Sequence, residues 1–350
     1  MDSCREVPRE RWNALASESV YQSWEWYSAL ESEEEGLTRY VVVRDGRDLL
    51  AVLPVSGLRR RRAASYDPAF RTSGGAAEDT DFWPLLLLGN RRGFSSPPIL
   101  RVGSEGSIRA WSLAFQVATE IRAAEGWRAV AMLYVPSAYE PWLARAGALS
   151  TLTRLRGSRE AVLTLPRSFD AYLAGLSSGR RSAVRREMRT FVASGTSTTV
   201  GFLDPDDCTY EAWLTCQTEA KYGAAPAPER MARQLRALAD AFGERCVVFR
   251  TYRDDVMTAM AGFLLHEKGF FARFFGADYA TAHRFDYFCT LFYAPIHWAI
   301  EHHFEFANFG TGSEAAKEAR GAVLTPLVSL AGWDLSLAIR PEAATGTGTA

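Results

Sequence analysis

The sequence predicts an α/β protein built from two similar domains. Its 350 residues exceed the usual size of a single hydrophobic core. Segments with the apolar pattern of strands alternate with segments that have the pattern of helices. The second half also repeats the order of the first, because in each half a hairpin is followed by a helix, a strand, a short helix and a strand. We place the boundary near Gly157, which gives domains at 1–157 and 158–340.

In the first half, Asp45-Gly46 between two β-rich runs is a strong hairpin signal, and it joins predicted strands at 40–44 and 49–55. Tryptophans supply the apolar side of two short helices that come before this hairpin, at 8–15 and 23–30. The remaining elements are predicted as a strand at 83–88, a helix at 107–124, a strand at 127–135, a helix at 139–146 and a strand at 148–155.

The second half begins with a strand at 160–165, helices at 168–176 and 179–194, a strand at 198–202 and helices at 207–221 and 229–242. A hairpin at 246–252 and 256–266 leads to an aromatic strand at 270–275 and a long helix that crosses Pro295 and ends at His303. A strand at 304–309 and a Gly-Thr-Gly turn follow, and Ser313 is expected to cap a short helix. Strands at 325–330 and 333–340 close the fold, and residues 341–350 are expected to be disordered because they have nothing to bury.

Composition excludes several classes of protein. A formal net charge of -1 argues against a protein that coats nucleic acid through bulk charge. Five cysteines without a C-x-x-C pair suit a reducing compartment and no structural zinc. The polar N-terminus does not resemble a signal peptide, and no apolar run approaches the roughly 20 residues needed to span a bilayer. We therefore expect a soluble cytoplasmic protein.

Candidate functional residues lie on two loops at the ends of predicted strands. Asp278 and Tyr279 follow the strand at 270–275, and Glu314 and Lys317 follow the Gly-Thr-Gly turn. Lysine is rare in this chain, since 37 of its 40 Lys and Arg residues are arginine and only three are lysine. A retained lysine therefore suggests a need for a compact ammonium group. These loops bring an acid, a phenol and an ammonium group towards one edge of a sheet, where ligands bind in α/β proteins.

A basic helix provides a second candidate surface. Arg181, Arg185 and Arg189 are spaced four residues apart and form one ridge, which Arg180 and Arg186 widen. This ridge is either a solvated face or a clamp for the phosphates of a nucleic acid or nucleotide-linked substrate.

Two further pairs of residues have competing interpretations. Lys221 and Tyr222 end their helix either as a C-terminal cap or as a substrate contact. His302-His303 suggests a metal site, but a third ligand at a useful spacing is lacking. We therefore interpret the pair as favourable helix-end charges or packing and expect no metal.

Two ordered motifs resemble those of tandem GNAT-fold acyltransferases, and among these the Fem-like ligases and the peptidoglycan biosynthesis N-acyltransferases. The first motif is Tyr172-Leu-Ala-Gly-Leu-Ser-Ser followed by the arginines at 180, 181, 185 and 186. The second runs from Ala299-Ile300 through Phe309-Gly310 to Lys317 and Arg320-Gly321. They frame roughly residues 160–330, and the internal repeat extends the resemblance more loosely to the first half, where Leu143 occupies the place of Lys317.

The resemblance implies two GNAT domains with mixed sheets and transfer of an acyl or aminoacyl group to a primary amine. In Fem-like ligases the donor is aminoacyl-tRNA and the acceptor is a peptidoglycan precursor, and the lysine of the closing motif, here Lys317, lies near the donor ester. Lys317 is then suited to stabilise the oxyanion, Asp278 or Glu314 to hold or deprotonate the amine, and Tyr279 to protonate the leaving oxygen. Structural alternatives are a turn-forming Asp278, a helix-start Glu314 and a buried Tyr279.

One departure from the coenzyme-A-dependent GNAT enzymes bears on the donor. Those enzymes carry [R/Q]-x-x-G-x-[G/A] before the long helix to bind pyrophosphate, whereas this chain has Gly276-Ala-Asp278-Tyr279 there. The acid would repel phosphate, so aminoacyl-tRNA is the preferred donor and tRNA the expected partner. No further cofactor and no DNA partner are expected. An acyl-CoA-dependent transferase and a non-catalytic protein that binds RNA or another partner remain the alternatives.

Overall fold

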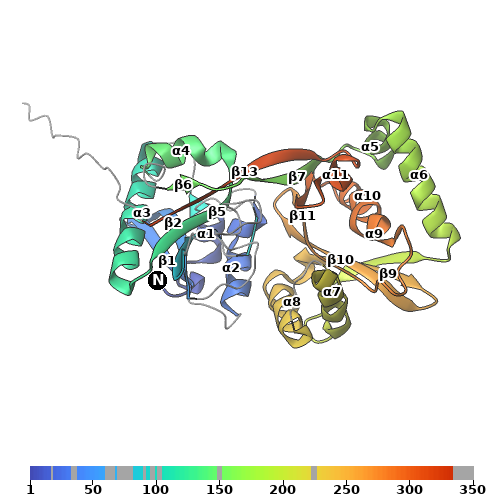
Figure 1. Cartoon of the computed structure of the whole chain (residues 1–350), viewed down its shortest axis with the longest axis horizontal. Helices are drawn as coiled ribbons and strands as arrows, with labels where there is room; N and C mark the ends of the chain where they lie inside the picture. The colour runs from blue at the N-terminus through green and yellow to red at the C-terminus, as the bar shows by residue number, and fades with distance from the viewer. Residues whose placement is uncertain are drawn as a thin grey trace, which may run out of the picture.

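The computed structural model describes residues 1–16, 19–32, 38–59, 68, 82–89, 92–94, 99–100, 105–147, 152–221 and 227–333. The predicted strand at 333–340 and the tail at 341–350 lie outside these ranges apart from Trp333. Each half contains a hairpin, a third strand, a helical segment, a strand parallel to the third, and a short helix (Figure 1).

The first half comprises η1 (Cys4–Glu6), α1 (Arg9–Asn13), η2 (Val20–Gln22), α2 (Trp24–Glu31), β1 (Thr38–Asp45), β2 (Asp48–Leu58), β3 (Leu85–Leu88), β4 (Ile99–Leu100), α3 (Glu105–Glu125), β5 (Ala129–Pro136), η5 (Ser137–Tyr139), α4 (Glu140–Arg145) and β6 (Thr153–Arg154). Gly46 adopts a φ of 55° in the turn between β1 and β2, where glycine is needed because other residues are strained. The predicted hairpin is thus present at Asp45-Gly46.

The second half comprises β7 (Ser158–Thr164), α5 (Phe169–Gly175), α6 (Ser178–Ala193), β8 (Ser197–Phe202), α7 (Thr209–Lys221), α8 (Pro228–Phe242), η6 (Gly243–Arg245), β9 (Cys246–Arg253), β10 (Val256–His266), β11 (Gly269–Ala277), α9 (Asp286–Phe288), η7 (Cys289–Tyr293), α10 (Ala294–Glu301), β12 (Phe306–Thr311), α11 (Glu314–Glu318) and β13 (Val323–Gly332). Helices α9, η7 and α10 form the predicted long helix, but η7 is a π-helix. Pro295 cannot donate to the carbonyl four residues earlier, which disfavours regular α-helical bonding there.

The described strands of both halves form one mixed sheet in the order β1-β2-β3-β5-β13-β7-β12-β11-β10-β9-β8, with β4 on β2 and β6 on β13. Strand β13 joins the halves, because Val323–Leu327 pair with β7 whereas Leu327–Gly332 pair with β5. Figure 1 shows β13 running from the second half into the first. The sheet therefore continues across the expected domain boundary, which itself stays a prediction.

The hydrophobic core also crosses between the halves. Buried residues of the N-terminal helices, among them Trp12 and Trp26, belong to the same cluster as Leu214 on α7, Leu235 on α8 and Phe271 on β11. Gly276 on β11 allows α7 to lie against the sheet, because a Cβ there would come within 2.6 Å of the Leu214 backbone. One face of the second half's strands is thus covered jointly by its own helices and by helices of the first half.

Candidate active site

The turn after β12 positions Lys317. Gly310, Gly312 and Ser313 all have positive φ, at 66°, 75° and 47°, so the chain bends sharply into α11. The Nζ atom of Lys317 donates to the carbonyl oxygen of Gly310 at 3.0 Å and to that of Thr311 at 2.8 Å. The lysine therefore binds the end of the strand that precedes its own helix.

Ser313 stands at the N-cap position of α11, but its side chain makes no capping hydrogen bond. The expectation that this serine caps the helix is therefore wrong. Its left-handed backbone conformation differs from the extended conformation of a typical N-cap residue, which directs the side-chain oxygen to the first-turn N–H groups.

The Lys317 side chain is buried, with the residue only 5 % exposed. Burial lowers the pKa of Lys317 from 10.5 to about 8, and the negative charge of Glu314 opposes this change. The group is therefore mainly an ammonium at neutral pH. An ammonium has three N–H donors. Within the described chain, two of these N–H groups donate to the carbonyls of Gly310 and Thr311. The third N–H is left for a substrate oxygen.

A hydrogen-bonded chain connects Lys317 to the middle of the sheet. Nδ2 of Asn308 on β12 donates to Oε2 of the buried Glu160 on β7 at 2.8 Å. The backbone N–H of Gly310 donates to Oδ1 of Asn308 at 2.8 Å, and the carbonyl of the same glycine accepts from Lys317. These bonds satisfy buried polar groups and fix the local position of the lysine.

The pairing of β12 with β7 is irregular at this point. Asn308 pairs with Val162 and Thr311 pairs with Glu160, so two residues of β12, Phe309 and Gly310, oppose one residue of β7. This bulge turns the end of β12 towards α11. The sequence indicated the Gly-Thr-Gly turn, but Glu160 and Asn308 were missed because their contact spans 148 residues.

Glu314, the second candidate on α11, forms an ion pair with Arg159 of β7. Its carboxylate is therefore already engaged by a guanidinium rather than aimed at Lys317. Arg320, just after α11, makes a buried ion pair with Glu187 of α6 at 3.1 Å and lies 3.5 Å from the ring centroid of Phe288. Both contacts tie the Lys317 region to neighbouring elements, and Arg320 belongs to the closing motif that the sequence had indicated.

Asp278 and Tyr279 lie on the loop after β11, against α7 rather than α11. In Figure 1, α11 is at the upper edge of the second half and α7 is at its lower edge. No hydrogen bond or ion pair within the described chain joins Asp278 or Tyr279 to Lys317 or Glu314. The four residues predicted to be catalytic therefore form two separate groups.

Asp278 shapes its own loop. Its carboxylate accepts from the backbone N–H of Ala280 at 3.0 Å and from the hydroxyl of Thr281 at 2.7 Å. The N–H groups of Thr281 and Ala282 donate to the Asp278 carbonyl, and that of His283 donates to the buried carboxylate of Asp286. Successive N–H donors before α9 are therefore bonded to acceptors of the same loop.

Tyr279 and Lys221, which the sequence indicated separately, lie together. The Lys221 ammonium is 4.2 Å from the centroid of the Tyr279 ring, and the Tyr279 hydroxyl is 3.4 Å from the hydroxyl of Thr218 on α7. Tyr279 is 45 % exposed, so it is not the buried aromatic considered as an alternative. Tyr222 lies outside the described residues.

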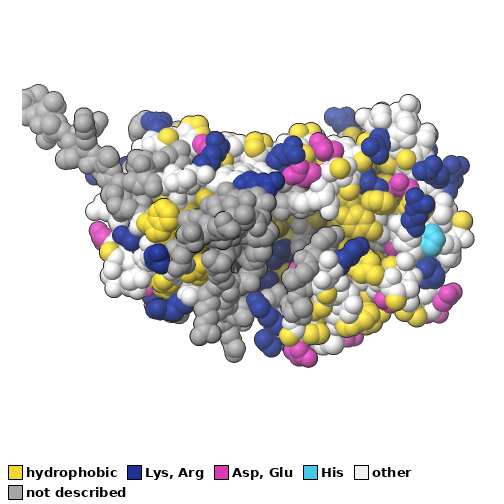
Figure 2. All heavy atoms as spheres, in the orientation of Figure 1, with side chains coloured by type: hydrophobic (Ala, Val, Ile, Leu, Met, Phe, Trp, Pro, Cys, Tyr) yellow, Lys and Arg dark blue, Asp and Glu magenta, His cyan; other side chains and the backbone are white. Residues whose placement is uncertain are grey.

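Helix α6 presents its arginines to solvent. Arg180 and Arg185 are exposed and Arg181 is half-buried, with its Nη1 donating to the carbonyl of Ala174 at 3.3 Å. Glu187, the acid on this helix, points inward to Arg320, so it does not neutralise the outer surface. Figure 2 shows Lys and Arg side chains gathered at the end of the molecule that carries α5 and α6.

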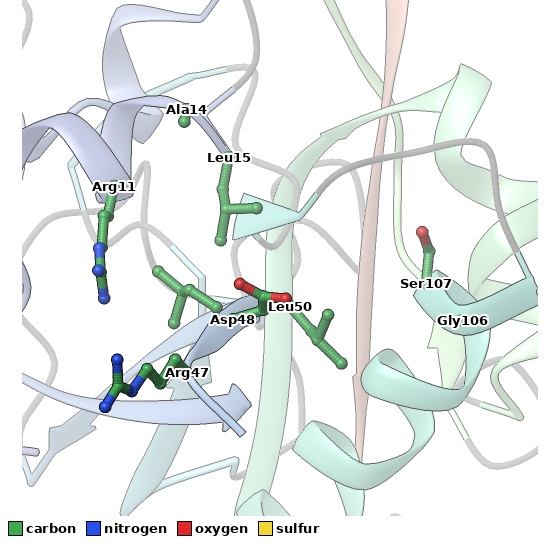
Figure 3. Close-up of a pocket in the computed structure, with 9 residues that line it drawn as sticks. Arg11, Ala14, Leu15, Arg47, Asp48, Leu50, Gly106 and Ser107 are labelled. Carbon is green, nitrogen blue, oxygen red and sulfur yellow. The ribbon is translucent and has the colours of Figure 1, made fainter. Parts of the chain in front are cut away.

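A pocket of about 550 Å³ lies in the first half, between α1, the β1–β2 turn and the start of α3. Figure 3 shows Arg11 and Arg47 on one side of it and Ser107 on the other, with Asp48 between them. None of the residues predicted to be functional lines this pocket. Across the described residues there is neither a cluster of three potential metal ligands nor a helix that is both long and apolar enough to span a membrane.

Comparisons with solved structures identify proteins with the same fold. FemX has 13% identical residues and a TM-score of 0.60, with 92% of this chain and 96% of that chain covered. The C-terminal domain of a putative lysylphosphatidylglycerol synthetase from Agrobacterium fabrum has 13% identical residues and a TM-score of 0.57, with 94% of this chain and 92% of that chain covered. L-PGS from Bacillus licheniformis has 10% identical residues and a TM-score of 0.57, with 95% of this chain and 93% of that chain covered. No curated protein matches the chain.

The fold is therefore that of two tandem GNAT-like domains with a mixed sheet, as the sequence predicted. The roles assigned to individual residues stay predictions. A family model described as peptidoglycan biosynthesis and recognition matches residues 3–335, nearly the whole chain. The protein belongs to this FemAB-like family.

Proposed function

We propose that the protein is an N-acyltransferase that moves an acyl or aminoacyl group, from an aminoacyl-tRNA, to the primary amine of a small or peptide substrate. Membership of the FemAB-like family supports this class of reaction. The observation that carries the proposal is the buried ammonium of Lys317, held by two carbonyl groups with one N–H left over.

The reaction explains why such an ammonium is useful. The amine nitrogen attacks the carbonyl carbon of the donor ester, and the carbonyl oxygen becomes an oxyanion. The C–O bond to the ribose then breaks, the ribose oxygen takes up a proton, and the nitrogen loses one to leave an amide. Lys317 donates its third N–H to the oxyanion, and a preorganised donor of this kind contributes about 3–4 kcal/mol to transition-state stabilisation.

The loop after β11 supports a donor other than coenzyme A. In a coenzyme-A-dependent enzyme the N–H groups before the long helix would bind pyrophosphate. Here those of Ala280 and His283 donate to the carboxylates of Asp278 and Asp286, which already occupy the place of an anion. The two acids would also repel phosphate. The exposed arginines of α6, by contrast, offer sites for the phosphates of tRNA.

The other predicted residues favour supporting roles. Asp278 holds its turn and Glu314 pairs with Arg159, so neither carboxylate is left unengaged to accept the amine proton. Tyr279 is exposed, but it lies with Lys221 and Thr218 rather than with Lys317. We therefore assign the main catalytic contribution to Lys317.

The donor can be tested with purified protein in a translation extract supplied with candidate amines. Amide formation should stop after ribonuclease treatment and return when purified aminoacyl-tRNA is added with a ribonuclease inhibitor. Acetyl-CoA should not restore it, and calorimetry should show only millimolar binding of coenzyme A. Tight coenzyme A binding with ribonuclease-resistant turnover would replace tRNA with acyl-CoA as the donor. RNA binding without turnover from any donor would favour a non-catalytic protein.

A further inference from the structure

Within the described chain, the guanidinium of Arg273 on β11 has no anionic partner. It makes no hydrogen bond and no ion pair with the described chain, and its Nε atom is buried without an acceptor. Its guanidinium carbon lies 5.0 Å from the centroid of the Trp26 ring on α2 of the first half. Arg273 therefore lies between the two halves of the protein, and its donors bond no acceptor of the described chain.

Trp26 has the same deficiency. The residue is 1 % exposed, and its Nε1–H has no acceptor in the described structure. A buried donor without a partner costs about 1–3 kcal/mol, and native proteins leave few of them unless a ligand or water completes the site. Two such donors in one stacked pair indicate an acceptor that binds there from outside the fold.

In the described chain, the two other stacked arginines that are not exposed, Arg245 and Arg320, differ from Arg273 in their charge balance. Arg245 lies over Phe242 and forms an ion pair with Glu25 at 2.8 Å. Arg320 lies over Phe288 and pairs with Glu187 at 3.1 Å. In both cases a carboxylate of the chain balances the charge. Among the stacked arginines of the described chain that are shielded from solvent, Arg273 thus differs in having no carboxylate partner.

The position of Arg273 in the sheet suits a ligand. Strands β11 and β12 are parallel but pair only through Gly269–Phe271 and Phe306–Asn308, and they separate beyond these residues. Arg273 is the extra residue of a bulge, because Ala272 pairs with Phe263 and Phe274 pairs with Gly262 on β10. Its contact with Trp26, which shares a cluster with Phe271, places it on the face of β11 that carries Phe271. Ligands bind at the carboxyl ends of parallel strands where neighbours diverge.

The same face leads to Lys317. Phe271 pairs with Asn308 across the two strands, and Asn308 begins the chain of hydrogen bonds that passes through Gly310 to the lysine. Burial raises the pKa of Tyr21, the positive charge of Arg273 lowers it, and the negative charge of Glu160 raises it. Both charges thus act on one phenol.

We propose that Arg273 and the indole N–H of Trp26 bind a carboxylate group of the acceptor, whose amine is directed towards Lys317. This inference rests on the proposed transfer to an amine. A carboxylate fits because the planar guanidinium donates two parallel hydrogen bonds to its two oxygens. A phosphate dianion would bring a second negative charge that one arginine cannot balance.

Binding is measured without any donor, so that it does not depend on turnover. Calorimetry compares peptides of two to five residues that have a free amine, such as alanyl-alanine, with the same peptides as C-terminal amides. The parent should prefer the acid by roughly 10- to 100-fold, the contribution of one or two charge-assisted hydrogen bonds. Arg273→Met keeps an apolar stem against Trp26 and should abolish this preference. Trp26→Phe should reduce it while keeping an aromatic face.

Arg145→Met is the matched control, because Arg145 is an exposed arginine that lies over Trp142 at 5.6 Å. It should leave the acid preference unchanged. Thermal unfolding provides a second readout, since Arg273→Met should fold with an unchanged or higher Tm if the arginine serves a ligand. Arg273→Lys keeps the charge without the fork and should recover only part of the preference.

Three outcomes would overturn the carboxylate site. These are equal binding of acids and amides by the parent, an undiminished acid preference in Arg273→Met, and Arg273-dependent binding of inorganic phosphate without binding of any peptide acid. Failure of the proposed function is distinguishable from these, because the acid preference would then persist in a protein that transfers nothing from any donor.

Discussion

Lys317 and Gly310 are joined by a hydrogen bond of 3.0 Å from the lysine Nζ to the glycine carbonyl oxygen. Gly310 also donates its N–H to Asn308, so one residue connects the candidate catalytic amine, through Asn308, to the buried carboxylate of Glu160. The position of the amine thus depends on strand pairing between β7 and β12. One substitution can therefore remove the charge of Lys317, and a different substitution, in the strand pairing, can disturb the bonds that hold it.

Replacement of Lys317 by Met should lower kcat on the order of 10²-fold or more and change KM less. The contact strengthens only when the oxyanion forms, so its loss affects the transition state more than the bound substrate. Steady-state kinetics with aminoacyl-tRNA would measure both constants. Lys317→Arg should rescue poorly because its planar fork does not fit a compact ammonium site. Leu143→Met, at the matching place on α4, is the control, and near-normal turnover in Lys317→Met would exclude a catalytic role.

The stability of the protein should depend on pH through Lys317. Its pKa is about 8 in the folded state and 10.5 ordinarily, so between these values the unfolded state binds more protons. The cost of burying the charge is complete below pH 8 and disappears as pH rises towards 10.5, which stabilises the folded protein by about 3 kcal/mol across that range. Urea unfolding of the parent and of Lys317→Met should therefore converge or cross with rising pH, and parallel curves would contradict the lowered pKa.

Asn308→Asp should destabilise the protein by about 1–3 kcal/mol at neutral pH. It replaces the amide that donates to Glu160 with a second carboxylate in the same buried place. Repulsion raises the pKa of one carboxyl group in the folded state. The loss of stability is therefore small below about pH 4, grows above that pH, and is complete once the pH exceeds the raised pKa. Unfolding measured from pH 3 to 8 would test this. Adding Glu160→Gln should restore stability, because its amide donates to the new carboxylate.

The combined Arg181→Ala and Arg185→Ala variant should bind its donor more weakly and with a flatter dependence on salt. Each lost phosphate contact lowers the slope of log K against log salt by roughly one. Binding to labelled aminoacyl-tRNA at several salt concentrations would measure the slope. Arg109→Ala, an exposed arginine on α3, serves as the control. An unchanged slope in the double variant would mean that α6 is only a solvated face.

The sequence by itself determined the features that depend on neighbouring residues. Asp45-Gly46 indicated the first hairpin because glycine accepts the positive φ of its turn, and apolar periodicity indicated most helices and strands. The repeated order of elements predicted two related domains, and the closing motif drew attention to Lys317. Ser313 was the exception, since a side chain suited to capping does not determine the backbone conformation of its own turn.

Only the tertiary structure decided what depends on residues far apart in the chain. It placed Asn308 against Glu160, separated Asp278 from Lys317, and brought Lys221 beside Tyr279. It also continued β13 from one half into the other and stacked Arg273 on Trp26. A local pattern cannot encode such pairs, because strand register and burial arise when the whole sheet and core assemble. The lowered pKa of Lys317 has the same origin, since its main cause is the loss of water around a group that the sequence alone would leave exposed.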